Sequence, residues 1–341
     1  MKYLYIFLLP IIIYLINGLL KKKSLLMNYS GEIHQKFTIK ENIPLSGGIL
    51  ILSSFYLYFY DYSDVFNLHL FLIFLLGLSA DLKIIKSAQK RFIFQIIILY
   101  LFIDFIDMSI FNTRILYLDK LLTNPVFNNL FVLFCVLIVV NGTNFIDGLN
   151  TNVLGYYIIV SLILYKINFF YILDLSSSQW VGWIICLAIL YFFNLFKLLF
   201  IGDNGAYVLG LIYSYLLIHF YNVDQNISPF FIILLLWYPC FEILFSIIRK
   251  FKSNKSPIKP DNNHFHQLIF LYFKDSLKLK TLISNNLGAN VINLYNLIIL
   301  YIGSLSVRDT QFQIILIVLN VLVYVFLYIK LYKKSIKNIN L

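Results

Sequence analysis

Four short polar segments interrupt a strongly apolar chain, and each carries side chains that could bind a metal ion or a phosphate. They are SADLKIIKSAQKR (79–91), NGTNFIDGLN (141–150), FIGDNG (200–205) and KPDNNHFHQ (259–267). Carboxylate and carboxamide oxygens suit Mg²⁺, which usually takes one or two protein oxygens and leaves its other positions to water and phosphate. Lysine and protonated histidine can stabilise the charge on a leaving phosphate. Together these residue types suit phosphoryl transfer, which depends chiefly on positioning and charge stabilisation.

Each segment alone also has a plainer interpretation. Asparagine, aspartate and glycine cap helices and form turns, so any one segment could simply end a helix. Lysines beside membrane helices, such as Lys83 and Lys86, commonly serve as topology anchors. The combination favours a site, because an acid, several carboxamides, a Gly-Asp turn and a His-x-His pair are expected on the same side of the membrane.

The elements that position these segments are expected to be membrane helices. Of the 341 residues, 60% are hydrophobic and only 13% are charged, whereas a soluble protein has roughly a quarter charged residues. Several apolar runs approach the roughly 17–25 residues that a helix needs to cross the hydrocarbon core. The sequence therefore predicts an all-α, polytopic integral membrane protein. We see no internal repeat or change in composition, which favours a single domain over residues 1–341.

Eleven crossings are predicted, which would place the two ends of the chain on opposite sides. The predicted spans are 3–20, 45–60, 66–80, 92–107, 126–140, 151–167, 180–199, 205–221, 229–248, 287–305 and 311–330. With the N-terminus outside, all four polar segments face the cytoplasm. The basic residues support this orientation because positive charge is retained in the cytoplasm. If Lys197 is counted as cytoplasmic, the exceptions among the 27 Lys and Arg are Lys2, Arg114, Lys120, Lys166 and Arg308.

The net charge of +11 is then largely a topology signal, and no nucleic-acid partner is expected. The expected partners are membrane lipid and the substrates of the polar site. The sequence leaves a homodimer open.

In order and content, the polar segments resemble the motifs of the polyprenyl-phosphate N-acetylhexosamine-1-phosphate transferases. The resemblance runs from IPLSGG at Ile43 to His266, and the eleven-helix layout resembles the branch that initiates O-antigen. It implies transfer of a sugar-1-phosphate from a UDP-N-acetylhexosamine to undecaprenyl phosphate, giving a lipid diphosphosugar and UMP. It also implies Mg²⁺ as cofactor, with Mn²⁺ as a substitute. The location implied is the bacterial inner membrane, where the product would start a cell-surface polysaccharide.

The resemblance assigns a metal site and a nucleotide pocket. GTNFIDGLN is similar to the family's N-x-x-N-x-x-D-G motif, which implies that Asn144 lies on or beside the metal ion. Asn141, Asp147 and Asn150 would then shape the nucleotide pocket. FIGDNG resembles the family's Gly-Asp turn, so Asp203 would be the principal metal ligand and a catalytic residue.

The resemblance also assigns contacts to the phosphates. Lys90 falls where family members place a lysine that contacts the diphosphate. HFHQ is similar to the family's histidine loop, which implies that His264 and His266 contact the phosphates or the sugar as catalytic residues. Lys36, together with His34, matches the first cytoplasmic loop only loosely and would bind substrate.

Three positions depart from the family pattern. Ala80-Asp81 stands where the family usually has two aspartates, so Asp81 is the only carboxylate there to assist the lipid phosphate or position the metal. Asn150 replaces an aspartate found in many bacterial members, and Gln267 replaces the third histidine. Asparagine can still read a uracil edge through its donor and its acceptor. The change at Ala80 indicates either a subgroup working with one carboxylate or a catalytically weakened member.

A transporter or lipid flippase is the alternative from another class. Transporters tend to bind substrate near the bilayer midplane, on broken helices related by a repeat. Here the charged candidates stand at helix ends. The sequence does not identify the sugar, and loop shape around residues 252–267 is expected to select it.

Overall fold

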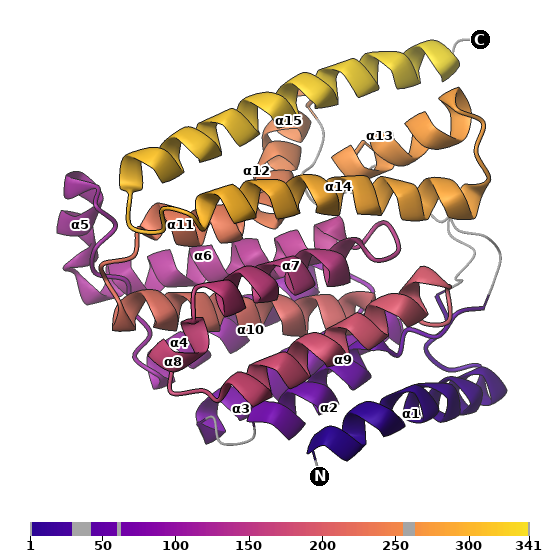
Figure 1. The fold of residues 1–341 in the computed structure, drawn as a ribbon, viewed down its shortest axis with the longest axis horizontal. Helices are drawn as coiled ribbons and strands as arrows, with labels where there is room; N and C mark the ends of the chain where they lie inside the picture. The colour runs from indigo at the N-terminus through magenta and orange to yellow at the C-terminus, as the bar shows by residue number, and fades with distance from the viewer. Residues whose placement is uncertain (1, 29–41, 60–62, 255–262, 340–341) are drawn as a thin grey trace.

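The structure is a computed structural model that describes residues 2–28, 42–59, 63–254 and 263–339. These residues form helices and loops, with one isolated β-bridge between Met27 and Pro44. Figure 1 shows the arrangement. The helices are α1 (Lys2–Lys23), α2 (Gly47–Phe59), α3 (Asp64–Asp81), α4 (Ala88–Phe105), α5 (Leu116–Leu122), α6 (Pro125–Ile146), α7 (Asn152–Lys166), α8 (Phe169–Ile172), α9 (Ser177–Leu195), α10 (Gly202–Val223), α11 (Pro229–Leu235), α12 (Trp237–Lys252), α13 (Phe265–Leu271), the π-helix η2 (Tyr272–Ser276), α14 (Thr281–Gly303) and α15 (Thr310–Ile339).

Among the described residues, seven helices are long and apolar enough to cross a membrane. They are α1, α3, α6, α9, α10, α14 and α15; α11 and α12 add an eighth span if this pair, bent by 76°, is counted as one. The chain is therefore an all-α polytopic membrane protein, as predicted. The count of eleven is not confirmed. At the other predicted spans, α2 and α7 are shorter apolar helices, and α4 carries Lys90, Arg91 and Asp104.

Helix α10 forms the centre of the bundle and packs against α2, α3 and α6. Small residues allow this close packing, as is usual between membrane helices. A Cβ on Gly210 would lie 2.6 Å from the Cα of Val140 in α6, and one on Gly77 of α3 would lie 2.5 Å from the Cα of Asn204. Figure 1 shows α1 and α15 at opposite edges of the bundle, with α10 between them.

Helix α6 extends further than predicted and carries two of the candidate residues. Asn124 caps its start by accepting a hydrogen bond from the N–H of Phe127 at 3.1 Å, and Pro125 follows at the first helical position, where proline is favoured. We expected the span to end at residue 140, but the helix continues to Ile146. Polar side chains therefore belong to its last turns, and do not lie in a loop.

These contacts predict that Gly77→Ala destabilises the protein. The added methyl group would overlap the backbone of α10, and such overpacking typically costs about 1–3 kcal/mol. Thermal unfolding of the purified protein in detergent measures the effect as a lower melting temperature. Gly18→Ala in α1 is the matched control, because a Cβ there meets nothing within 4 Å. Equal melting temperatures for the two variants would contradict this account of the α3–α10 contact.

Candidate active site

The end of α6 and the start of α10 meet at the centre of the candidate site. The Asn144 Nδ2 atom donates a hydrogen bond to Asp203 Oδ1 at 2.8 Å. These two residues are 59 positions apart in the chain. The structure therefore brings together the two side chains that the sequence analysis assigned to one metal ion.

Three polar residues at the end of α6 share one side of the helix, and one of them hydrogen-bonds to α10. Residues three apart lie on the same side of a helix, so Asn141 and Asn144 share a face with Asp147, which ends the helix. Asn141 donates its amide to the carbonyl of Leu137 at 2.9 Å, within its own helix. Asn144 is the one of these three residues that hydrogen-bonds to Asp203. The nucleotide-binding role of Asn141 stays a prediction.

Asp81 holds the turn that carries Asp203. Gly202 has a φ of +73°, a left-handed conformation that glycine adopts readily. Asp81 Oδ1 accepts from the backbone N–H of Asp203 at 3.0 Å. Asp81 Oδ2 accepts from the backbone N–H of Asn204 at 3.0 Å and from its side-chain amide at 2.5 Å. A carboxylate at a helix N-terminus satisfies unpaired donors and favours the helix dipole. These contacts make Asp81 a residue that positions the turn of Asp203; its action on a lipid phosphate stays a prediction.

Arg91 is a member of the site that the sequence analysis did not select. Its Nη1 atom forms an ion pair with Asp203 Oδ2 at 2.5 Å. Lys90, which we had assigned to the diphosphate, is exposed on the first turn of α4. The two residues are adjacent, and only the helix register shows that Arg91 faces α10. The side chains of Arg91 and Asp203 remain about a quarter exposed, at 24% and 28%, so the pair is accessible from solvent.

Three carboxyl groups, those of Asp81, Asp147 and Asp203, gather around this turn. Burial raises the pKa of Asp147 well above its usual range, and the nearby carboxylates of Asp203 and Asp81 raise it further. Each ionised carboxylate disfavours the ionisation of the others, and a cation bound among them would relieve this repulsion. The described residues contain no group of three or more His, Cys, Asp or Glu that could hold a metal ion. An open site built on Asp203 and Asn144 nevertheless fits Mg²⁺, which accepts few protein ligands.

The histidine loop meets the other side of the α6 terminus. A Cβ on Gly148 would lie 2.0 Å from His266 Nε2, so His266 packs directly on the Asp147-Gly148 turn. Burial lowers the pKa of His266 to about 4, and the neighbouring His264 also lowers it. His266 is therefore neutral at pH 7 and does not supply the positive charge expected of the loop. The His264 ring stacks on His266, with centroids 5.6 Å apart, and meets the ring of Phe145 edge-on at 5.2 Å.

The structure places the remaining candidates away from Asp203 or outside its description. Asn150 is buried, and its backbone and side chain donate to Asn285 at 2.8 Å and Asn286 at 3.3 Å in α14. These bonds attach the turn after Asp147 to α14, and uracil recognition by Asn150 stays a prediction. Lys36 and His34 lie outside the described residues.

Comparison with known proteins points to one glycosyl transferase family. The model of glycosyl transferase family 4 matches residues 65–221, the segment that includes Asp81, Asn144 and Asp203. The chain is similar to the undecaprenyl-phosphate alpha-N-acetylglucosaminyl 1-phosphate transferase of Thermotoga maritima, with 27% identity over 253 residues. That match covers 74% of this chain and 76% of the relative.

The raised pKa of Asp147 predicts that Asp147→Asn stabilises the protein at neutral and alkaline pH. In the unfolded chain the pKa of aspartate is about 3.9, so a raised pKa means that the folded state binds the proton more tightly. The stability contributed by this proton is complete below the unfolded pKa and is lost as pH rises through the folded pKa. Asparagine has no acidic proton, so the variant does not lose this stability as pH rises.

Thermal unfolding across pH 4 to 8 provides the test. We expect the variant to melt a few degrees higher than the wild type at pH 8 and at about the same temperature at pH 4. Asp104→Asn changes an exposed aspartate and serves as the control. A variant that melts below the wild type at pH 8 would show that the ionised carboxylate has a stabilising partner.

Proposed function

We propose that the protein transfers an N-acetylhexosamine-1-phosphate from its UDP derivative to undecaprenyl phosphate and releases UMP. The observation that carries the proposal is the contact of Asn144 with Asp203, which joins two helix termini at an open, acidic site. The match of residues 65–221 to the model of glycosyl transferase family 4 supports a phospho-sugar transferase in general terms. The similar Thermotoga maritima enzyme is named for undecaprenyl phosphate and N-acetylglucosamine, which supports these substrates for this chain.

The residues of the site have distinct tasks in this proposal. Asp203 and Asn144 would hold Mg²⁺, which supplies charge neutralisation at the diphosphate of the donor. Arg91 lies beside the same carboxylate, and its planar guanidinium can donate two parallel hydrogen bonds to a phosphate. Asp81 fixes the backbone of the α10 turn, so that Asp203 keeps one orientation while substrates exchange. A preorganised site of this kind needs little rearrangement at the moment of transfer.

An apolar cavity supports a lipid acceptor. It has a volume of about 340 Å³ and lies between α6, α10 and the bent α11–α12 pair. Its lining includes Phe131, Phe134, Ile138, Ile218 and Phe230. On α6 the lining extends to Val139, about half a helical turn before Asn141. A cavity of this composition suits the hydrocarbon chain of a polyprenyl phosphate whose headgroup lies at the end of α6.

The distribution of basic residues supports a cytoplasmic site in a bacterial inner membrane. There a soluble nucleotide sugar can approach from one side and a lipid from the other. The lipid diphosphosugar formed would begin a cell-surface polysaccharide.

The direct test is release of UMP by the purified protein from a panel of UDP-N-acetylhexosamines, in the presence of undecaprenyl phosphate and Mg²⁺. Identification of the lipid product by mass spectrometry gives the sugar. We expect EDTA to stop the reaction and added Mg²⁺ to restore it. A transporter or a scaffold without activity would release no UMP from any donor, and that result would contradict the proposal.

Asp203→Ala is expected to abolish transfer, because it removes both the carboxylate at the proposed metal site and the partner of Arg91. Membrane insertion and monodispersity in detergent should stay normal, since Asp81 caps α10 through backbone groups. Asp104→Ala is the control for loss of an aspartate elsewhere. Near-wild-type turnover of Asp203→Ala would remove the metal assignment.

Arg91 and Lys90 provide a matched pair for the phosphate contact. Arg91→Gln should lower kcat about a hundredfold, in line with loss of a positioned donor at developing charge. Lys90→Gln should change kcat by no more than about threefold, because Lys90 is exposed on the α4 surface. The reverse order of effects would restore the assignment of the diphosphate contact to Lys90.

A further inference from the structure

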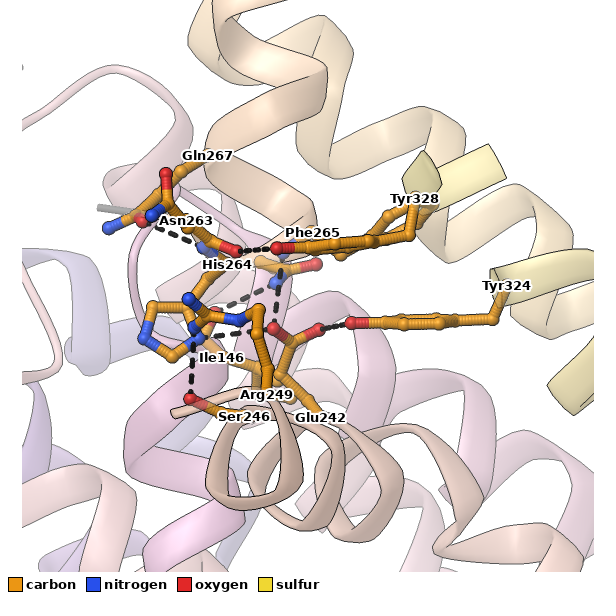
Figure 2. Close-up of polar contacts among 11 residues, drawn as sticks. Ile146, Glu242, Ser246, Arg249, Asn263, His264, Phe265, Gln267, Tyr324 and Tyr328 are labelled. Carbon is orange, nitrogen blue, oxygen red and sulfur yellow. Dashed lines mark hydrogen bonds and ion pairs between the residues drawn. The ribbon is translucent and has the colours of Figure 1, made fainter. Parts of the chain in front are cut away.

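Glu242 of α12 is a buried carboxylate, only 1% exposed, that contacts the histidine loop. Figure 2 shows it between the loop and two tyrosines of α15. An ionised carboxylate removed from water is costly unless donors satisfy it. The hydrogen bonds that Glu242 accepts therefore decide whether it can stay ionised beside His264.

Three donors surround the carboxylate. Glu242 Oε1 lies 3.1 Å from His264 Nδ1 and accepts from the backbone N–H of Phe265 at 3.1 Å. Glu242 Oε2 accepts from the hydroxyl of Tyr324 at 2.7 Å. The donors come from the loop, from the start of α13 and from α15, so this single side chain connects three parts of the fold.

The contact with Glu242 sets both the proton position and the orientation of His264. An ionised carboxylate only accepts hydrogen bonds, so His264 Nδ1 must carry a proton. The opposite ring nitrogen, Nε2, is then directed away from Glu242. The ring is further fixed by Phe145, which adjoins Asn144, and by the parallel ring of His266. Glu242 thus orients the imidazole next to the helix end that carries the Asn144–Asp203 contact.

The ionisable groups around His264 oppose one another. His266 stacks on it from the same loop. Arg249 of α12 lies beside it in Figure 2, and Lys250 lies over the Phe145 ring at 5.9 Å. Tyr324 approaches from α15 through Glu242. The two cations disfavour a positive charge on His264, whereas the Glu242 carboxylate favours it.

We propose that Glu242 is the positioning residue of His264, holding the ring through Nδ1 and supporting the positive charge that His264 presents to the leaving phosphate. This inference rests on the proposed function. Glu242 touches no substrate, and no proton is transferred in this role. Tyr324 orients the carboxylate, so that α15 contributes to the site through Glu242.

The first experiment compares the pH dependence of UMP release for the wild type and Glu242→Gln. Glutamine keeps an oxygen that can accept from Phe265 but removes the charge. An opposite charge nearby favours the charged form of a histidine, and glutamine does not supply that charge. We expect the alkaline limb of kcat to move down by about one pH unit or more. We also expect kcat at neutral pH to fall about tenfold or more, while KM for the nucleotide sugar changes less than about threefold.

Double variants separate positioning from a general structural effect. If Glu242 acts through His264, adding Glu242→Gln to His264→Ala causes no further loss of kcat. Tyr324→Phe should likewise have no further effect in the Glu242→Gln background. Tyr328→Phe is the matched control one helical turn away, since its hydroxyl donates to the carbonyl of Asn263 at 3.0 Å. Tyr328→Phe should change kcat by the same factor in the wild type and in the Glu242→Gln variant. An unmoved alkaline limb, or additive losses for Glu242 and His264, would overturn the proposal.

Nitrogen NMR of labelled histidine tests the contact between Glu242 and His264 in the wild-type protein. It needs neither a substitution at Glu242 nor a measurement of activity. His264→Gln identifies the signal. We expect Nδ1 to stay protonated from pH 5 to 9, and a deprotonated Nδ1 in the neutral ring would overturn the proposal. If the wild type released no UMP, the proposed function would fail, and the NMR result would still decide whether Glu242 holds His264.

Discussion

The capping of α10 by Asp81 is the interaction on which the rest of the site depends. Asp81 ends α3, and its two oxygens accept from the first residues of α10. This bond network fixes the backbone at Asp203, and Asp203 in turn contacts Asn144 from α6 and Arg91 from α4. Four helices thus meet at one turn. The family motif that this segment resembles has two aspartates where Ala80 and Asp81 stand. Here the retained Asp81 caps the first turn of α10.

The C-terminal end of α6 is the second point of convergence. Asn144 faces α10, Phe145 faces the histidine loop, and the turn after Asp147 packs on His266 and is attached to α14. Because α6 also lines the apolar cavity, one helix borders both the polar site and the space that suits a lipid chain. This arrangement explains why the apolar run of α6 ends in a dense series of polar residues.

Much of this organisation could be predicted from the sequence, because membrane helices and polar helix ends leave strong local signals. The all-α class, the apolar segments and the grouping of Asn144 with Asp203 were predicted. The helix boundaries at Ile146 and Gly202 were not, because the predicted spans followed the apolar runs, whereas α6 and α10 extend into the polar residues beside them. Arg91 was missed in favour of Lys90, since adjacent residues differ by about 100° around a helix and only packing fixes the register. Glu242 was also missed, because a single acid in an apolar segment gives no sign of its partner 82 residues later, Tyr324.

Helix α15 connects the lipid surroundings of the protein to the histidine loop. Little of α15 is buried against the other helices. Its side chains Tyr324 and Tyr328 nevertheless point inward and donate hydrogen bonds to Glu242 and to the backbone of Asn263. Detergents or fusion tags that displace the last helix therefore act on His264 before they disturb α10, the most enclosed helix of the bundle. The conditions chosen for purification then become a variable in any kinetic study, and a lipid nanodisc with an untagged C-terminus is the preparation that preserves this connection.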